Sequence, residues 1–234
     1  MGVLETVGRI QHLGLRPHFE AKVAALRASF EQRTGAFSSD DPWFEERSRA
    51  FWNDAVTAGR FGRHVESELA PTERAWLGPL ERAHRGLFRG AKGNVLIDAW
   101  SGAELLVTAL EDQSRAELRA SSGQLFDGRV VAFEEPWTVA LLPGAVFHAA
   151  SATVPIGLVI AAARARSLST VETLDALLRM DRTLRSLSRV KAAFAYRPEA
   201  LLPPLPTRAR EGKPAPALGG EGRRGTFRQH DGER

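Results

Sequence analysis

Residues 94–142 space their apolar side chains differently from the rest of the chain. On either side of this stretch, apolar residues recur every three or four positions, which is the period of an amphipathic helix. Within it they alternate or run together between turn signals, a pattern typical of short strands. We therefore predict an α+β fold in which a compact antiparallel β module (91–148) lies between two helical arms (1–90 and 149–200).

The first arm is predicted to hold three or four helices packed as a bundle. One helix is expected over residues 18–33, where a single apolar stripe is formed by Phe19, Val23, Leu26 and Phe30. Asp41 followed by Pro42 predicts the start of the next helix, because Asp caps helix N-termini and Pro favours the first helical position. A further helical stretch opens at Pro71 and keeps its apolar period as far as Leu87.

Five short strands are predicted in the β module. Ser101-Gly102 separates the first two strands and is a hairpin signal, and Asp127-Gly128 is a second turn signal. Residues 115–120 alternate between charged and apolar types, which predicts a half-exposed strand. Strands of this size commonly curl into a small barrel or a strongly bent meander, and a flat sheet covered by the helical arms is the alternative.

The second arm returns to helical spacing. One helix is predicted over residues 154–166, and Ser169 with Glu172 forms a capping box for a long helix that Pro198 ends. Residues 201–234 lose all periodicity and are rich in Pro, Gly and Arg. Their seven basic and four acidic residues give a net charge of +3, most of the +4 of the whole chain. We predict that this basic tail is disordered.

Composition excludes several classes of function. The chain has no cysteine, so it holds neither disulfides nor thiolate metal sites, which fits a reducing compartment such as the cytoplasm. No run approaches 18 consecutive apolar residues, so no membrane span is expected. A secretory signal is not evident at the N-terminus.

Glu81 and His84 are the candidate metal ligands. Glu-x-x-His on a helix is half of the ligand pattern of di-iron bundles, which need a second such pair. That second pair is absent, and a Glu–His neighbour pair on the surface explains the motif equally well. His64-Val-Glu66 lacks the cysteines that a zinc deaminase requires. No cofactor-binding motif is found, so no cofactor is predicted.

Aromatic and basic residues supply the candidate contacts to a ligand or to nucleic acid. They are two tryptophans at strand ends, two arginines of the last helix and two arginines of the tail: Trp100, Trp137, Arg182, Arg189, Arg223 and Arg224. The tryptophans could line a groove or close the ends of a barrel, and the sequence leaves both readings open.

The last predicted helix carries charges at ion-pair spacing. Asp175 precedes Arg179 by four residues, and Asp181 precedes Arg185 in the same way. These are the favourable helix pairs, so we expect a solvated, ion-paired face here.

Four segments resemble a β module found in uncharacterised bacterial proteins: Arg85-Gly-Leu-Phe, Leu96-Ile-Asp-Ala-Trp-Ser-Gly-Ala, Asp127-Gly-Arg-Val-Val and Leu141-Leu-Pro-Gly. In those proteins a strand pair around a D-x-x-[ST]-G turn precedes a G-x-R-V-V strand, and Asp98 to Gly102 departs slightly from that spacing here. The resemblance covers about a quarter of the chain. It implies a small β fold between helices and brings no activity or site residues with it.

A large apolar core without a convergent titratable cluster favours a non-catalytic binding or adaptor protein. The helical arms would contact a protein partner or a second copy of the chain. One alternative is nucleic-acid binding through the β module and the Arg-rich tail. The other is a metal-dependent enzyme built around Glu81 and His84.

Overall fold

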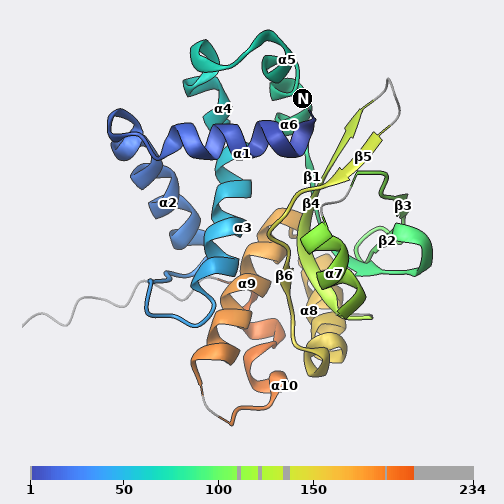
Figure 1. Cartoon of the computed structure of the whole chain (residues 1–234). Coiled ribbons are helices and arrows are strands. Elements are labelled where there is room, and N and C mark those ends of the chain that lie inside the picture. Colours follow the sequence, from blue (N-terminus) through green and yellow to red (C-terminus); the bar gives the residue numbers. More distant parts are fainter. Residues whose placement is uncertain (1, 110–111, 121–122, 134–137, 188, 203–234) are drawn as a thin grey trace, which may run out of the picture. The chain divides into compact units, whose positions relative to one another are not determined.

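The computed structural model describes residues 2–109, 112–120, 123–133, 138–187 and 189–202 (Figure 1). Met1–Pro203 form one compact unit. Its α-helices are α1 (Val3–Gly14), α2 (Glu20–Thr34), α3 (Phe44–Val56), α4 (Phe61–His64), α5 (Pro71–Arg74), α6 (Leu77–Glu81), α7 (Asp112–Ala120), α8 (Thr153–Ala165), α9 (Thr170–Ser186) and α10 (Ala192–Ala195). Its strands are β1 (His84–Gly90), β2 (Val95–Asp98), β3 (Glu104–Leu106), β4 (Leu125–Phe133), β5 (Thr138–Leu141) and β6 (Val146–Phe147). Short 3-10 helices cover Pro17–Phe19, Glu66–Glu68, Lys92–Asn94, Ala150–Ala152 and Pro198–Leu201.

The six strands form one antiparallel sheet in the order β3-β2-β1-β4-β5, with β6 pairing to β4. The antiparallel module is therefore confirmed, but the barrel is wrong because the sheet is not closed. One isolated bridge joins Ala109 to Ala140, so the sheet curls without its edge strands forming a ladder. The hairpin at Ser101-Gly102 is also confirmed: β2 and β3 pair across it, and Gly102 takes a positive φ of 77°.

Two local predictions in the β module are wrong. Asp127-Gly128 is not a turn but lies in the middle of β4. Gly128 faces Gly86 of β1 across the ladder, and a Cβ at Gly86 would meet the ring of Phe88 at 2.6 Å. Residues 115–120 belong to helix α7 and not to a strand. Leu118 of this helix packs against the sheet cluster that contains Phe88.

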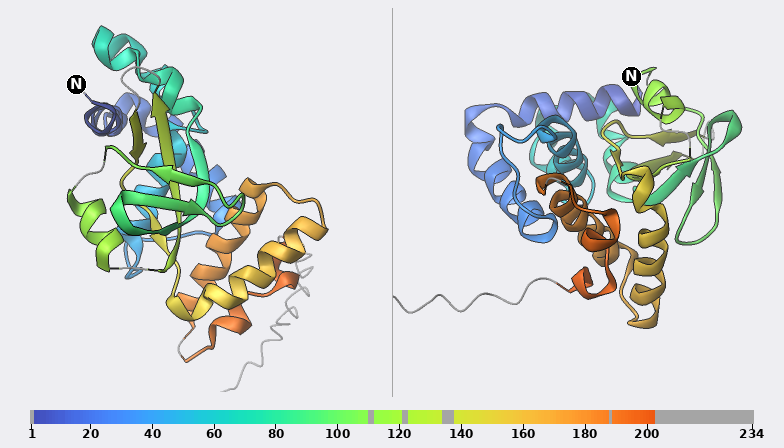
Figure 2. Two further views of the ribbon diagram at one scale, coloured as in Figure 1. Left: turned by 90° about the vertical axis from the view of Figure 1, so that its right-hand side faces the viewer. Right: turned by 90° about the horizontal axis from the view of Figure 1, so that it is seen from below.

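The two faces of the sheet pack against different partners. Leu87 and Leu125 share a cluster with α8 and α9, whose ribbons lie beside the sheet in Figure 2. Phe88 and Phe126, one position along each strand, belong to the cluster on the opposite face. This alternation follows from the two-residue period of a strand. It places odd-numbered positions of β1 and β4 on one face, where Leu87 and Leu125 pack with α8 and α9 and Val131 packs with the first helical arm.

The helices begin and end close to the predicted residues where local signals are strong. The stripe of α2 contacts the largest core cluster, and α8 spans the range expected for it. Ser169 caps α9, and the capping box with Glu172 is complete. The helix after Pro42 begins two residues late, at Phe44.

Two predicted helices are wrong in extent, and the predicted tail begins too early. The stretch from Pro71 ends at Glu81, and Leu87 belongs to strand β1. The last long helix ends at Ser186, so Phe194 lies on the separate short helix α10 and is exposed. Leu201, placed in the tail by sequence, is buried in a 3-10 turn. The rest of the predicted tail, 203–234, lies outside the described residues. No described helix has the length and apolar character needed to cross a membrane.

Candidate functional site

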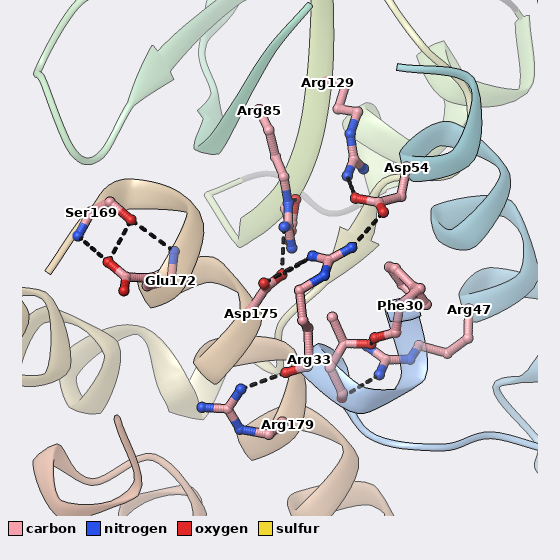
Figure 3. Close-up of polar contacts among 12 residues, drawn as sticks. Phe30, Arg33, Arg47, Asp54, Arg85, Arg129, Ser169, Glu172, Asp175 and Arg179 are labelled. Atoms are coloured by element: carbon pink, nitrogen blue, oxygen red, sulfur yellow. Dashed lines mark hydrogen bonds and ion pairs between the residues drawn. The ribbon is translucent and has the colours of Figure 1, made fainter. Parts of the chain in front are cut away.

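Three arginines and three aspartates form a largely buried ion network between the helical arms and the sheet, and Figure 3 labels all of them but Asp127. The network joins α2, α3, β1, β4 and α9 through the side chains of Arg33, Asp54, Arg85, Asp127, Arg129 and Asp175. It contradicts the expectation of an inert, wholly apolar core. Titratable groups converge here because odd-numbered positions of β1 and β4 share one face, where Arg85 meets Asp175 of α9 and Arg129 meets Asp54 of α3.

Arg85 is the centre of the network. Its Nε and Nη2 donate to the carboxylate of Asp127, at 3.1 and 2.6 Å, and its Nη1 donates to Asp175 at 2.6 Å. Asp175 also accepts from Arg33 Nη1 at 2.9 Å. Arg33 Nη2 in turn donates to Asp54 at 2.5 Å. Buried arginine forks of this kind give strong, directional hydrogen bonds because both partners are charged.

The acids of the network set its protonation states. Burial alone would lower the pKa of Arg85, but Asp127 and Asp175 outweigh it and raise that pKa above its ordinary value. Burial opposes the ionisation of Asp175, yet Arg85 and then Arg33 hold the pKa of this carboxyl below its usual range. Both groups therefore stay charged at neutral pH.

Arg129 is the exception among the three arginines. It is 5% exposed, and its Nη2 donates to Asp54 at 2.6 Å, a carboxylate that it shares with Arg33. Burial, and then the neighbouring charge of Arg85, lower its pKa to about 10. Arg129 is thus a buried cation at the wall of a cleft. A guanidinium carries five N–H donors, and the hydrogen bond to Asp54 uses one of them.

A cleft of about 580 Å³ opens beside Arg129. Its polar lining includes Arg33, Arg85, Arg129, Asp54, His84, Ser29 and Thr57. Its apolar lining includes Leu26, Ala58, Ala83 and Val171. Thr170 and Val171 are the first two residues of the 17-residue helix α9, so the positive end of that helix also faces the cleft. The volume lies in the range of small-molecule sites.

The predicted metal pair lies at the edge of this cleft but not on one helix. Glu81 ends α6, and His84 begins β1. Glu81 binds Arg63 at 2.5 Å, and His84 Nε2 lies 3.3 Å from Asp98 Oδ2. Within the part of the chain that is described, no three His, Cys, Asp or Glu side chains gather as a metal site. The helical Glu-x-x-His geometry is therefore wrong.

The other sequence candidates are not brought into one place. Trp100 is half-buried after β2 and packs under Arg164, whose guanidinium carbon lies 5.2 Å from its ring centre. Arg182 is exposed on α9, and Arg189 is exposed in the turn that follows it, with a positive φ of 64°. Trp137, Arg223 and Arg224 lie outside the described residues. These candidates define no common surface in the described chain.

The predicted solvated face of α9 is wrong at both aspartates. Asp175 turns inward to Arg33 and Arg85, and Arg179 instead donates to the backbone oxygens of Arg33 and Leu201. Asp181 does pair with Arg185, at 2.8 Å, but it is buried.

A second buried polar cluster surrounds Asp181. Tyr196 donates to Asp181 Oδ1 at 3.2 Å, and its hydroxyl lies 2.8 Å from His148 Nδ1. Burial lowers the pKa of His148, so this imidazole is neutral at pH 7. His148 Nε2 has no hydrogen-bond partner among the described residues. This cluster is enclosed by α9 and α10 and does not line the cleft.

Sequence reasoning missed the network, although one signal could have indicated it. Arg85, Asp127 and Arg129 stand among apolar residues in strands, at positions where the strand period directs the side chain inward. A charge buried in this way needs a partner.

The chain matches no protein-family model, no curated protein and no solved structure. The resemblance to uncharacterised bacterial β modules gains no support from these comparisons, and no argument below rests on it.

Proposed function

We propose that this protein is a non-catalytic binding protein, and that its cleft holds a small organic carboxylate with an apolar body. One observation carries the proposal: the buried guanidinium of Arg129, whose ion-pair partner among the described residues is Asp54, lines a cleft that apolar side chains also line. A carboxylate matches a guanidinium fork in shape and charge. The α9 N-terminus adds attraction for an anion.

The ion pairs of the cleft support binding without chemistry. Each titratable acid that lines the cleft already has a cationic partner: Asp54 binds Arg33 and Arg129, and Glu81 binds Arg63. His84 is oriented by Asp98. A general base or a nucleophile needs a lone pair aimed at the substrate, and these ion pairs occupy the cleft carboxylates that could supply one.

Calorimetric titration with hexanoate tests the proposal, with hexanol as the uncharged control. We expect hexanoate to bind and hexanol to bind much more weakly. The variant Val171→Glu places a negative charge in the cleft at a helix position that favours acids, so the fold is retained while the ligand is repelled. Val171→Gln is its neutral control and should bind hexanoate nearly as the wild type does.

Two bulky substitutions, one inside the cleft and one outside it, test whether hexanoate binds in the cleft. Ala58→Trp fills the cleft from the turn after α3, whereas Ala28→Trp is a matched change at an exposed position of α2 that does not line it. The first should abolish hexanoate binding and the second should not. Equal affinity of the wild type, Val171→Glu and Ala58→Trp would show that the cleft is not the site. Conversion of the bound acid to a product would overturn the non-catalytic assignment.

The exposed face of α8 favours a second function, self-association with another copy of this chain. Val154 and Leu158 are 76% and 62% exposed, and Gly157 between them leaves room for a close helix neighbour. The arginines at the end of α8 turn to the body of the protein: Arg164 to the Trp100 carbonyl and Arg166 to that of Pro198. The outer face is thus uncharged, so two copies can meet without repulsion.

Light scattering after size exclusion tests this second function. We expect a dimer that Leu158→Arg converts to monomer, because the change places like charges at the twofold contact. Leu106→Arg is the control, since Leu106 is also exposed but lies on strand β3. A wild-type monomer, or equal effects of both changes, would contradict self-association through α8.

A further inference from the structure

A second hollow lies at the opposite end of β1 from the cleft. It occupies about 530 Å³ between the β1–β2 turn and helix α7. The turn is held by two successive residues with positive φ, Gly93 at 71° and Asn94 at 60°. Leu118 of α7 packs beside Gly90, the last residue of β1 before the turn: its Cδ2 lies 3.8 Å from the position that a Cβ on Gly90 would take.

Three basic side chains line this hollow: Lys92, Arg115 and Arg119. Arg115 and Arg119 are four residues apart and therefore lie on one face of α7. Lys92 approaches from the turn on the other side. No acid is found among the described residues that line it, in contrast to the cleft, whose lining includes Asp54 and Glu81. The hollow therefore has an uncompensated positive charge in the part of the chain that is described.

We propose that this hollow binds the phosphoryl group of a small phosphorylated ligand. Two guanidiniums and an ammonium suit a phosphate better than a carboxylate, because a phosphate monoester carries close to two negative charges and three acceptor oxygens. Arginine supplies planar forks for those oxygens, and lysine supplies a movable point charge. This site is independent of the carboxylate cleft.

The experiment is a calorimetric titration of the full chain with pyrophosphate at low salt. The double variant Arg115→Gln/Arg119→Gln is compared with Arg182→Gln, an exposed arginine of α9. Lys92→Gln is compared with Lys22→Gln, an exposed lysine of α2. We expect pyrophosphate to bind, the double variant to weaken binding at least about tenfold, a loss of about 1.4 kcal/mol, and both controls to retain the wild-type affinity. Hexanoate should not compete.

Other outcomes overturn the proposal. The proposal is wrong if the wild type does not bind pyrophosphate. It is also wrong if the hollow variants and their controls lose affinity for pyrophosphate equally. A single-stranded oligonucleotide that binds and is not displaced by excess pyrophosphate would assign the hollow to nucleic acid instead. All side chains that are changed lie at the surface or are half-buried, and circular dichroism of each variant confirms that the fold is retained.

Discussion

Asp175→Asn isolates the contribution of the buried network to stability. The substitution keeps the shape of the side chain and removes a charge that two arginines share, at 2.6 Å from Arg85 and 2.9 Å from Arg33. Breaking a buried ion pair costs about 3–5 kcal/mol, because an unpaired charge stays behind. Arg85 keeps Asp127 and Arg33 keeps Asp54, so we expect the lower end, about 3 kcal/mol.

Urea unfolding at pH 7 measures the free energy of unfolding of both proteins. Asp40→Asn is the control, because Asp40 is exposed and its loss should change stability by less than about 0.5 kcal/mol. A surface ion pair contributes under about 1 kcal/mol. A loss of stability as small as this for Asp175→Asn would refute the claim that burial strengthens the ion pairs of Asp175.

The pH dependence of the same pair of proteins gives a second check. Because the pKa of Asp175 is lowered in the folded state, its charge stabilises the fold above the unfolded pKa of about 3.9. That stabilisation is lost as the pH falls through the folded pKa. The wild type and Asp175→Asn should therefore converge in stability below about pH 4. A difference that is the same at neutral and at strongly acidic pH would show that the lost stability is not electrostatic.

Three further predictions concern single positions. Burial lowers the pKa of His148, so the wild type should lose stability as the pH falls below about 6.5, while His148→Gln should lack this slope in urea unfolding over the same range. Gly144→Ala should destabilise the fold by more than about 1–3 kcal/mol, because Gly144 has a positive φ of 95° and a Cβ there would also lie 2.5 Å from Arg49 Cβ. Gly102→Ala is the control: Gly102 also has a positive φ but open space around it, so this variant should show the backbone cost alone. Equal shifts of the melting temperature in the two variants would contradict this prediction. Ser169→Ala should cost about 1 kcal/mol through loss of the α9 cap, measured by urea unfolding, and no loss would show that Glu172 caps the helix alone.

Predictions from the sequence were correct where the structure depends on residues that are neighbours in the chain. The stripe of α2, the start of α9 and the hairpin at Ser101-Gly102 follow from periodicity, capping and turn chemistry, all of which act within a few residues. Residues 115–120 show the limit of this reasoning. Six residues that alternate in charge also place Leu118 on one side of a helix, and its contact with the sheet decides between the two.

Long-range pairing overrode a strong local signal at Asp127-Gly128. Asp-Gly favours a turn, yet the aspartate accepts hydrogen bonds from Arg85, 42 residues away, and the glycine faces Gly86 across the ladder. The residues of the candidate site follow the same rule. Arg33 and Asp175 are separated by 142 residues, so no local pattern brings them together.

The existence of the network argues for a role beyond stability. Buried ion pairs can often be replaced by apolar side chains of the same volume without loss of stability. What apolar residues cannot do is hold a guanidinium at the wall of a cleft while the first turn of a long helix faces the same space. Asp54, shared by Arg33 and Arg129, keeps Arg129 charged without saturating its donors. The position of Arg129 at the wall of the cleft, and not its ion pairing, is therefore the basis of the proposed carboxylate site.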